Sequence, residues 1–422
     1  MPGETGRRTW VGMPAPRRDL ARWETLPLQD IALIEMGQSP PSESVREGLK
    51  YGLPFLQGNA EFAERYPRPV KSCVRPLKRA DPGDVLVSVR APVGAVNQAD
   101  RPLCIGRGLA AIRFRGVDSS YGYHALRGFS SLLRRVAQGS TFEAVGSVQL
   151  GDFHFTLPPP PEQRRIAEIL DTVDEAIQRT EELIAKLEEM KKGLLHDLLT
   201  RGIDENGELR DPERNPEQFK DSPLGRIPKE WEGPFRLDEL EECGVLELGR
   251  GNVISAVDMD EEPGPYPVYS SSAKETGMFG TYGKYMFEEE MITWSIDGGG
   301  RPFYRPKHRY SVTNVCGYLR ITYKSQWTCS FVHAIMEKQH SRITFDYQMK
   351  AHPSVIRELY WFARPNIEEQ HRISGVRDAF SQRIASEKDV VRKLRSLKQA
   401  LMNDLLTGRV RVTVPEPEEA TA

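Results

Sequence analysis

Apolar residues recur every seven positions in two long segments of the chain. The main row is Ile166, Val173, Thr180, Leu187 and Leu194 in the first segment, and Ile373, Phe380, Leu394 and Leu401 in the second. A seven-residue period over several heptads predicts a long helix that packs along another helix. Further apolar rows make the stripe wider than a two-stranded seam needs, which predicts burial against an additional surface.

Start and stop signals bound both segments. Prolines occupy residues 158–161 before the first, and Asn366 with Glu369 three residues later is a capping-box pattern before the second. Gly202 and Gly408 follow the last apolar turns, as helix ends prefer. We predict a central helix over residues 158–203 and a C-terminal helix over residues 364–410, each on the order of 50 Å long. Two core helices of one globular domain are the alternative, but core helices are usually about 10 to 14 residues long and lack a heptad.

The two helical segments are copies of one another. Residues 162–203 align without a gap onto residues 369–410, with Glu-Gln at the start and Asp-Leu-Leu-Thr near the end of both. A fainter echo precedes each copy, where Trp23 and Trp231 are followed by the similar runs Leu-Gln-Asp-Ile and Leu-Asp-Glu-Leu. The chain is therefore a tandem of two halves. We expect the helices to form an antiparallel coiled coil with pseudo-two-fold symmetry.

Outside the helices the pattern changes to short apolar runs that Gly and Pro turns divide. Expected strands cover residues 85–89, 110–114, 153–155, 291–296 and 317–322, and expected helices cover residues 123–137 and 328–338. This mixture predicts α+β domains with antiparallel sheet. The predicted organisation is a disordered N-terminal extension (1–22), a first globular domain (23–157), the central helix (158–203), a polar linker (204–230), a second globular domain (231–363), the C-terminal helix (364–410) and a disordered acidic tail (411–422).

Charge is balanced over the whole chain but not along it. The 58 basic and 60 acidic residues give a net charge of −2. Residues 75–135, however, hold eleven Lys or Arg against four acids, and residues 298–336 hold six basic residues and no acid. Two basic stretches in a balanced chain indicate two sites for a polyanion, although for either stretch alone a solvated face is the alternative.

Cysteine usage and hydropathy indicate the compartment. The five cysteines are scattered without a Cys-x-x-Cys pair, which favours reduced thiols over a disulfide framework or a zinc site. No apolar run approaches the length of a membrane span, and the first twenty residues lack the apolar core of a signal peptide. We therefore expect a cytoplasmic protein without a membrane partner.

Several turns place a polar side chain beside glycine, as a surface that reads base edges needs. Arg can make two hydrogen bonds to guanine, Asn or Gln can do so with adenine, and glycine lets backbone amides approach phosphates. Any one of these turns alone is more often a plain turn. The candidate DNA contacts are Gln38, Ser39, Gln57, Asn59, Ser88, Arg90, Arg107, Ser140, Thr141, Tyr269, Ser270, Ser271, Lys274, Trp294, Arg301, Arg305 and Lys307.

Catalytic signatures are absent from the sequence. The glycine run at residues 297–301 lacks the Lys-Ser/Thr of a P-loop, and no Gly-x-Ser-x-Gly, His-Glu-x-x-His or clustered metal-ligand set is present. The Asn-Pro-Pro-aromatic motif of amino-methyltransferases is also missing. Asp81 and Asp84 resemble a nuclease pair, but no Glu-x-Lys follows, and a turn at residues 82–84 is the better interpretation. We predict a chain that is not an enzyme and binds no cofactor or metal.

The sequence resembles the specificity subunits of type I restriction-modification systems. The duplicated helices carry the resemblance as LPPPPEQRRIAEIL with HDLLTRGI and as PNIEEQHRISGV with NDLLTGRV. Matching pieces before them are QGNAEF, PGDVLVSVRAPVGAV, CIGRGLAAIRF, QGSTFEAVGSVQL, GRIPKEW and YPVYSSSAKETGMFGTYGKY. The second copy departs from the pattern, because residues 364–367 replace the proline run and Arg377 and Arg383 interrupt the apolar stripe. These departures affect how symmetric the contacts of the second copy are with those of the first. They do not affect the resemblance, which covers nearly all of residues 23–410.

The resemblance implies that each globular half is a target-recognition domain for one part of a split double-stranded DNA site. The helical pair would act as a ruler between the halves and dock two methyltransferase subunits and, through them, restriction subunits. S-adenosylmethionine, ATP and Mg²⁺ would bind to these partners. Helix pairing and subunit docking would use Glu162, Gln163, Ile166, Leu170, Leu187, Leu194, Leu198, Glu369, Gln370, Ile373, Leu394, Leu401 and Leu405.

Two other classes of function remain as alternatives. An enzyme would need this chain alone to modify or cut DNA, against which the missing motifs speak. A coiled-coil scaffold without DNA contact would keep its function after charge reversal at Arg107 or Arg301, whereas a DNA reader would not.

Overall fold

The computed structural model describes residues 23–130, 133–135, 144–271, 277–343, 345 and 350–414. The chain divides into two compact units: unit 1 comprises residues up to Glu181 and from Val390 onward, and unit 2 comprises residues 182–389. Each long helix therefore contributes one part to each unit. The expected N-terminal extension (1–22), the candidate contacts Ser140, Thr141 and Lys274, and residues 415–422 of the expected tail lie outside the described residues.

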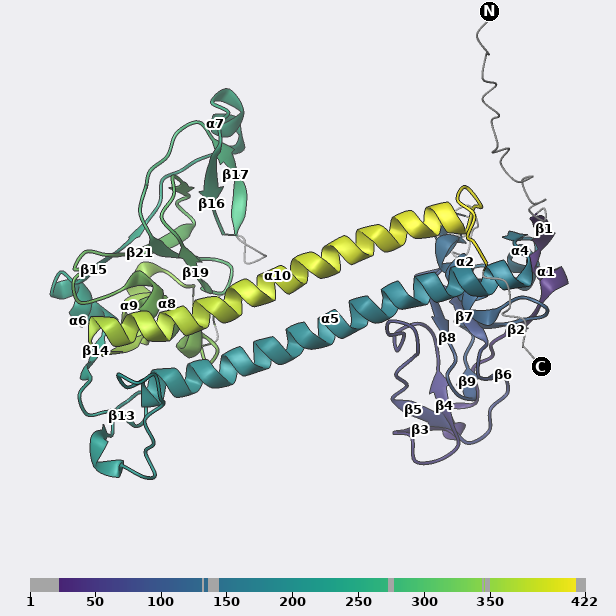
Figure 1. Ribbon diagram of the computed structural model, residues 1–422, viewed down its shortest axis with the longest axis horizontal. Helices are drawn as coiled ribbons and strands as arrows, with labels where there is room; N and C mark the ends of the chain where they lie inside the picture. Colours follow the sequence, from purple (N-terminus) through teal and green to yellow (C-terminus); the bar gives the residue numbers. More distant parts are fainter. Residues whose placement is uncertain are drawn as a thin grey trace, which may run out of the picture. The chain divides into compact units, whose positions relative to one another are not determined.

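Unit 1 is a mixed α+β domain with two larger sheets. Its elements are β1 (Glu24–Pro27), α1 (Leu28–Ile31), β2 (Ala32–Met36), η1 (Ser42–Ser44), β3 (Val45–Glu47), β4 (Leu53–Leu56), β5 (Lys71–Cys73), β6 (Arg79–Ala80), β7 (Val85–Ser88), β8 (Val96–Gln98), β9 (Leu103–Ile105), β10 (Leu109–Phe114), α2 (Ser119–Gly128), α4 (Ser147–Gly151), β11 (His154–Leu157) and the start of α5 (Pro160–Arg201). The sheets have the orders β2-β10-β7-β8 and β3-β5-β4-β9-β6, and β1 pairs with β11. Figure 1 shows β2, β7 and β8 beside the first part of α5.

Unit 2 is built from a similar set of elements. They are η2 (Pro216–Gln218), β12 (Phe219–Lys220), β13 (Ile227–Pro228), β14 (Glu232–Arg236), α6 (Leu237–Glu242), β15 (Leu246–Arg250), α7 (Ala256–Glu261), β16 (Tyr266–Tyr269), β17 (Met278–Tyr282), β18 (Met291–Ser295), β19 (Pro302–Arg305), β20 (Ser311–Val312), β21 (Cys316–Ile321), α8 (Cys329–His340), α9 (Pro353–Leu359), β22 (Trp361–Arg364) and the start of α10 (Ile367–Leu405). The sheets have the orders β15-β21-β18-β19 and β17-β16-β20, β14 pairs with β22, and β12 pairs with β13.

The two units repeat one topology. The sheet β2-β10-β7-β8 has its counterpart in β15-β21-β18-β19. In each unit a helix (α2 or α8), a shorter helix (α4 or α9) and a strand (β11 or β22) follow and lead into a long helix. Both units also hold one parallel strand pair, β4 with β9 and β16 with β20, which the expectation of antiparallel sheet did not include. The duplication seen in the helical sequences therefore extends through the globular halves.

Local sequence explains the elements that the pattern predicted. The central strands β7 and β18 are buried along their whole length, as continuous apolar runs between turns predict. Thr328 begins α8 by accepting a hydrogen bond from Phe331 N, close to the expected start. The helix expected over residues 123–137 instead begins at Ser119, because Asp118 caps it through Tyr121 N, and α2 ends at Gly128.

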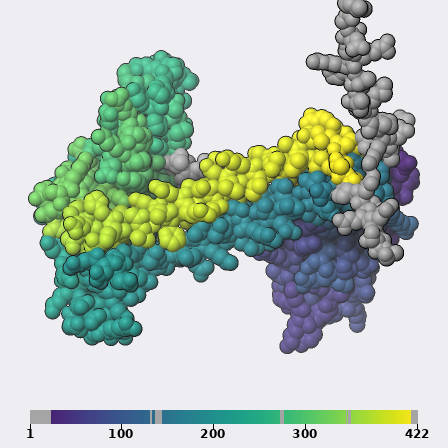
Figure 2. Space-filling view, viewed as in Figure 1, coloured from purple at the N-terminus to yellow at the C-terminus, as the bar shows by residue number. Residues whose placement is uncertain are grey.

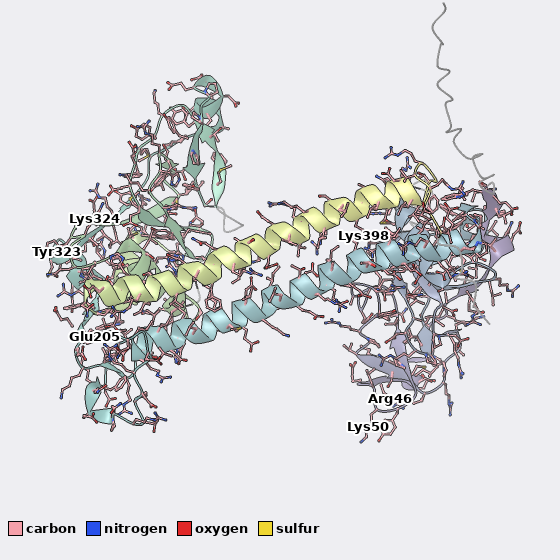
Figure 3. The ribbon with its side chains drawn as sticks, viewed as in Figure 1. Arg46, Lys50, Glu205, Tyr323, Lys324 and Lys398 are labelled. Carbon is pink, nitrogen blue, oxygen red and sulfur yellow. The ribbon has the colours of Figure 1, made fainter. Side chains whose placement is uncertain are left out.

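The two long helices run in opposite directions within each unit. In unit 1 Asp174 of α5 forms an ion pair with Lys398 of α10, and Figure 3 labels Lys398. Glu181 of α5 pairs with Arg395 of α10 at 2.5 Å. In unit 2 the pairing continues with Glu188 and Lys388 at 2.7 Å. Residue numbers fall along α10 as they rise along α5, which is an antiparallel arrangement.

Apolar side chains of the predicted stripe fill the space along this pair. In unit 1 one core cluster holds Ile166, Leu170, Leu401 and Leu405, and in unit 2 one cluster holds Leu194, Leu198 and Ile373. The same clusters contain strand and helix residues of the globular halves, so the stripe packs against an additional surface in each unit, as its width predicted. Leu187 and Leu394 are half-buried.

The segment over residues 204–230 is not a free linker. Phe219 and Ile227 are buried, and Ile227 belongs to the main core cluster of unit 2. Lys220 Nζ also donates to Gly233 O at 3.3 Å. The polar composition concealed these few apolar anchors, which fold the segment onto unit 2. No helix of the described residues has the length and apolar character to cross a membrane.

Candidate nucleic-acid interface

Three turns meet at one corner of unit 1, which we call corner 1: residues 37–39 after β2, residues 57–58 after β4 and residues 106–108 between β9 and β10. Backbone hydrogen bonds join the turns. Gln38 N donates to Ile105 O at 3.1 Å, and Gly106 N donates to Leu56 O at 2.7 Å. The corner is therefore fixed by the ends of the strands that carry it.

Polar side chains also meet at corner 1. Gln57 Nε2 donates to Ser39 Oγ at 2.8 Å, and the backbone N of Arg107 approaches the same oxygen at 3.4 Å. The side chains of Gln38, Gln57 and Arg107 are exposed. The structure thus brings together four candidate contacts, Gln38, Ser39, Gln57 and Arg107, that are far apart in the sequence.

Glycine allows the three turns to approach one another. A Cβ on Gly37 would lie 2.2 Å from Gly106 O, and a Cβ on Gly108 would lie 2.7 Å from Gln57 O. Both distances are shorter than real Cβ contacts, so a side chain at either position would separate the turns. The glycines that the sequence pattern singled out therefore have a packing reason.

A hollow of about 650 Å³ lies beside corner 1. Its lining includes Ser39, Gln57 and Arg107 of the corner together with Glu47 and Lys71 of neighbouring strands and the carboxylate residue Glu61. The lining contains two cations, Lys71 and Arg107. Lys71 forms an ion pair with Glu47 at 3.0 Å, whereas Arg107 has no carboxylate partner among the described residues. Exposed donors beside a hollow suit an acceptor-rich polyanion.

Unit 2 holds an equivalent group, corner 2: residues 251–253 after β15, residues 270–271 after β16 and residues 313–314 between β20 and β21. The backbone bonds recur, because Asn252 N donates to Val312 O at 3.1 Å and Thr313 N donates to Tyr269 O at 2.9 Å. A Cβ on Gly251 would lie 1.7 Å from Val312 O, so glycine is required here as at residue 37.

Corner 2 contains residues that sequence reasoning missed. By position in the topology, Asn252 corresponds to Gln38, Val253 to Ser39, Ser270 to Gln57 and Asn314 to Arg107. A usable signal existed, because Gly251-Asn252 is the same glycine–amide pair as Gly37-Gln38 and also follows a strand. Asn252 and Asn314 are exposed, and Val253 is 76% exposed.

Two candidate contacts are interior residues. Ser88 is 1% exposed, its Oγ donates to Pro92 O at 2.6 Å and accepts from Ala95 N at 3.0 Å, and it thereby stabilises the loop after β7. Trp294 is fully buried and its Nε1 donates to Ala351 O at 2.7 Å. These positions contradict the expectation that Ser88 and Trp294 contact bases.

Tyr269 and Arg305 are also occupied inside unit 2. The Arg305 guanidinium lies 3.6 Å from the centre of the Tyr269 ring, and Arg305 Nε donates to Thr293 Oγ1 at 2.8 Å. The Tyr269 hydroxyl is hydrogen-bonded to His308 Nε2 at 3.0 Å. Both residues are buried, so the structure contradicts a direct DNA contact and gives them the role of joining β16, β18 and β19.

The remaining candidates differ in accessibility. Arg90, Arg301 and Lys307 are exposed, and none of them forms an ion pair within the part of the chain that the structure describes. Asn59, Ser270 and Ser271 are half-buried; Ser270 Oγ accepts from Thr313 Oγ1 at 2.9 Å, and Ser271 O accepts from Ser295 Oγ at 2.7 Å.

Many cations of the two basic stretches are neutralised by acids from elsewhere in their unit. In unit 1 Arg127 pairs with Asp174 at 3.6 Å, and Lys78 pairs with Glu35. Arg113 pairs with Asp84 at 2.8 Å, an acid of the same stretch, which accounts for the aspartates of the 81–84 turn. In unit 2 Lys324 pairs with Glu289 at 3.2 Å, and Arg320 pairs with the same carboxylate at 3.5 Å. The linear charge count therefore overstated the free positive charge of both stretches.

The glutamate at the start of each long helix is buried in its unit. Glu162 accepts from Trp23 Nε1 at 3.1 Å and from Arg411 Nε at 2.7 Å. Burial opposes ionisation of Glu162, but the hydrogen bonds from Arg411 and Trp23 outweigh it and hold the pKa below its usual range. Glu369 makes the same contacts in unit 2, with Trp231 Nε1 at 3.3 Å and Arg210 at 2.6 Å. The two arginines follow the end of the opposite long helix, a relation that the sequence did not reveal.

The glutamine beside each glutamate holds the start of a neighbouring helix. Gln163 Oε1 accepts from Asp118 N at 2.9 Å, and Gln370 Oε1 accepts from Thr328 N at 2.9 Å. Asp118 and Thr328 are the N-cap residues of α2 and α8. All four Glu and Gln side chains are at most 5% exposed, which contradicts their assignment to subunit docking and makes them anchors between each long helix and its globular half. Glu369 N donates the expected capping hydrogen bond to Asn366 Oδ1 at 2.9 Å. The Glu369 carboxylate, however, accepts from Ile203 N, Arg210 and Trp231 instead of completing the capping box.

A family model of the type I restriction modification DNA specificity domain matches residues 21–189 and 228–395, one copy in each half of the chain. A putative type I restriction enzyme specificity subunit, MjaX of Methanocaldococcus jannaschii, is 41% identical over 186 residues, which are 43% of this chain and 43% of that protein. The MjaIX specificity subunit of the same organism is 28% identical over 225 residues, half of each chain. These alignments span half or less of the relatives' length.

The fold has solved counterparts. The crystal structure of the type I restriction-modification system S subunit from M. genitalium matches with a TM-score of 0.63 at 15% identity, covering 94% of this chain and 99% of that one. A structure described as showing complex assembly and conformational transition of the type I R-M system matches with a TM-score of 0.52 at 14% identity. The fold and the two copies of the domain agree with the duplicated corners and anchors described above. The chain therefore belongs to the family of type I restriction-modification DNA specificity subunits.

Proposed function

We propose that this chain reads a two-part sequence of double-stranded DNA, with corner 1 and its neighbours reading one part and corner 2 reading the other. The observation that carries the proposal is the recurrence of one exposed, glycine-built corner in two units of the same topology. Base edges in the major groove are distinguished by amide, guanidinium and hydroxyl groups held in fixed positions. Gln38, Gln57 and Arg107 in corner 1 and Asn252 and Asn314 in corner 2 supply such groups.

The paired helices α5 and α10 form the antiparallel coiled coil of this proposal and set the distance between the two DNA parts. Two methyltransferase subunits dock on the chain, and restriction subunits join through them. S-adenosylmethionine, ATP and Mg²⁺ belong to these partners, and the chain itself is not catalytic and works in the cytoplasm. Since the Glu-Gln anchors are buried, docking uses exposed positions of the helices instead.

A genome-wide map of methylated adenine tests the proposal in cells that carry the methyltransferase partner, with and without this chain. A split motif that depends on the chain is the expected result. Exchange of residues 88–148 for the corresponding segment of another family member should change one half of the motif and leave the other half unchanged. An active partner without any chain-dependent motif contradicts the proposal.

Charge reversal separates DNA reading from a scaffold that does not touch DNA. Arg107→Glu should abolish or alter the motif half read by unit 1, because a carboxylate repels phosphate and base acceptors. Arg115→Glu is the matched control, since Arg115 is also exposed but lies outside corner 1. An unchanged motif in Arg107→Glu would show that Arg107 does not contact the DNA, whereas a scaffold without DNA contact predicts no motif that depends on the chain.

A further inference from the structure

Corner 2 differs from corner 1 in the chemistry of one turn. Residues 251–253 (Gly-Asn-Val) stand where residues 37–39 (Gly-Gln-Ser) stand in unit 1, with the same backbone hydrogen bonds and the same need for glycine. Val253 is 76% exposed, although burial of an aliphatic side chain of this size stabilises a folded chain. Because Val253 and Asn252 are both exposed at this corner, we expect them to contact a molecule outside the unit.

The projecting part of unit 2 makes this turn accessible. Residues 251–253 lead into α7, which packs on β17, and Figure 2 shows this green segment standing out from the body of unit 2. Gly251 holds the turn against β20, because a Cβ there would meet Val312 O at 1.7 Å. The turn is therefore exposed at its tip and fixed at its base, which are the conditions for selective contact.

We infer that Asn252 and Val253 select an A·T base pair in the half of the DNA site that unit 2 reads, an inference that rests on the proposed function. An asparagine amide can donate to adenine N7 and accept from the adenine 6-amino group, and an apolar side chain can contact the thymine 5-methyl group. Both features lie on the major-groove edge of one A·T pair. Guanine and cytosine offer neither this donor–acceptor pattern nor the methyl group.

The residues around the turn agree with this choice. Asn314 occupies the place of Arg107, so corner 2 presents an amide where corner 1 presents a guanidinium, the group best suited to guanine. Ser270 and Thr313 are bonded to one another at 2.9 Å, which leaves the Asn252 amide without a side-chain partner among the described residues. Asn252 and Val253 are therefore the groups of the turn that are available to a base pair.

Modified bases test the inference with the complex of this chain and its methyltransferase. Once the motif is mapped and the half read by unit 2 is identified by the exchange of residues 88–148, each thymine of that half is replaced by uracil, which lacks only the 5-methyl group. One replacement should weaken binding about fourfold, as the loss of one buried methyl group predicts. Replacement of the paired adenine by 7-deazaadenine should weaken binding about fivefold or more.

Variants assign these effects to the turn. In Val253→Ser the complex should bind the uracil and thymine sites equally, and in Asn252→Ala it should lose its sensitivity to 7-deazaadenine. Val257→Ser is the matched control, because Val257 is 62% exposed on α7 but outside corner 2, and it should keep the full sensitivity.

Two results overturn the inference while the proposed function stands: a mapped half-site without an A·T pair, or a uracil effect that persists in Val253→Ser. A chain-independent methylation pattern refutes the proposed function and the inference together.

Discussion

At the scale of single residues, the buried glutamate at the start of each long helix connects more of its unit than the sequence pattern indicates. Glu369 is 1% exposed and accepts hydrogen bonds from Ile203 N at 2.8 Å, from Arg210 and from Trp231. In Glu369→Ala the Arg210 guanidinium loses this carboxylate in a site where its side chain is 10% exposed. We expect the free energy of unfolding of unit 2 to fall by about 3 to 5 kcal/mol, as for a broken buried ion pair. Urea unfolding followed by tryptophan fluorescence measures the change.

The neighbouring Glu368 provides the control for this substitution. It is exposed and lies in the same helical turn, so Glu368→Ala should change the stability by less than about 0.5 kcal/mol. Similar losses in the two variants would show that the anchor is not specific to Glu369.

A second residue-scale feature makes the stability of unit 2 depend on pH. His333 is bonded through Nδ1 to the Arg377 guanidinium at 2.8 Å and through Nε2 to Pro302 O at 3.2 Å. Burial and the positive charge of Arg377 lower the pKa of His333 to about 4. Between this value and the pKa of about 6.5 in the unfolded chain, the unfolded state binds a proton that the folded state does not bind. The free energy of unfolding should therefore fall by about 2 kcal/mol between pH 7 and pH 5.

The variant His333→Gln isolates this contribution, because glutamine does not titrate. Its unfolding free energy should fall less between pH 7 and pH 5 than that of the unchanged chain, and denaturant titrations at the two pH values provide the comparison. Parallel pH dependence of the two proteins would assign the effect to other groups.

At the scale of elements, the glycines of corner 1 matter through the contact between turns. Gly37→Ala places a Cβ 2.2 Å from Gly106 O, a backbone atom that cannot move without opening the corner. We expect a loss of about 1 to 3 kcal/mol in the stability of unit 1, as for an overpacked site. Thermal unfolding measures it.

Gly58→Ala is the matched substitution in the neighbouring turn, where a Cβ would meet no atom within 4 Å. It should leave the melting temperature nearly unchanged. Equal effects of the two alanines would mean that backbone flexibility, and not the close approach of the turns, determines the choice of glycine.

The elements also show which parts of the structure the sequence could predict. The heptads and the proline and glycine boundaries placed α5 and α10 within a few residues, because a period sustained over many turns is a strong signal. Buried strands such as β7 and β18 were equally visible as apolar runs.

The sequence predicted only part of corner 2, and the reason is physical. Glu162 and Glu369 lie 207 residues apart, but the equivalent Gly37 and Gly251 lie 214 residues apart, because the segments between the helices differ in loop length. The polar character of a residue also did not predict whether its side chain is exposed. Ser88 belongs to a polar turn and Arg305 to a basic stretch, but both are buried and hydrogen-bonded inside their units.

At the scale of the whole molecule, each helix start is completed by the other repeat. Arg411, after the end of α10, binds Glu162 at the start of α5 in unit 1, and Arg210, after the end of α5, binds Glu369 at the start of α10 in unit 2. The apolar contacts have the same reciprocity, because Ile166 packs in one cluster with Leu405 and the equivalent Ile373 packs in one cluster with Leu198. One repeat therefore carries both surfaces that its partner repeat needs.

A chain that ends at residue 230 should consequently form a homodimer, in which Arg210 of each copy binds Glu162 of the other and Leu198 packs near Ile166. Light scattering after size-exclusion chromatography measures the mass. With the methyltransferase partner, such a dimer should direct methylation to a palindrome that contains the half-site of unit 1 twice. Glu162→Arg in the truncated chain is the control, since it places two cations together and should give monomers. A monomeric truncated chain with intact Glu162 would show that the two repeats have diverged too far to replace one another.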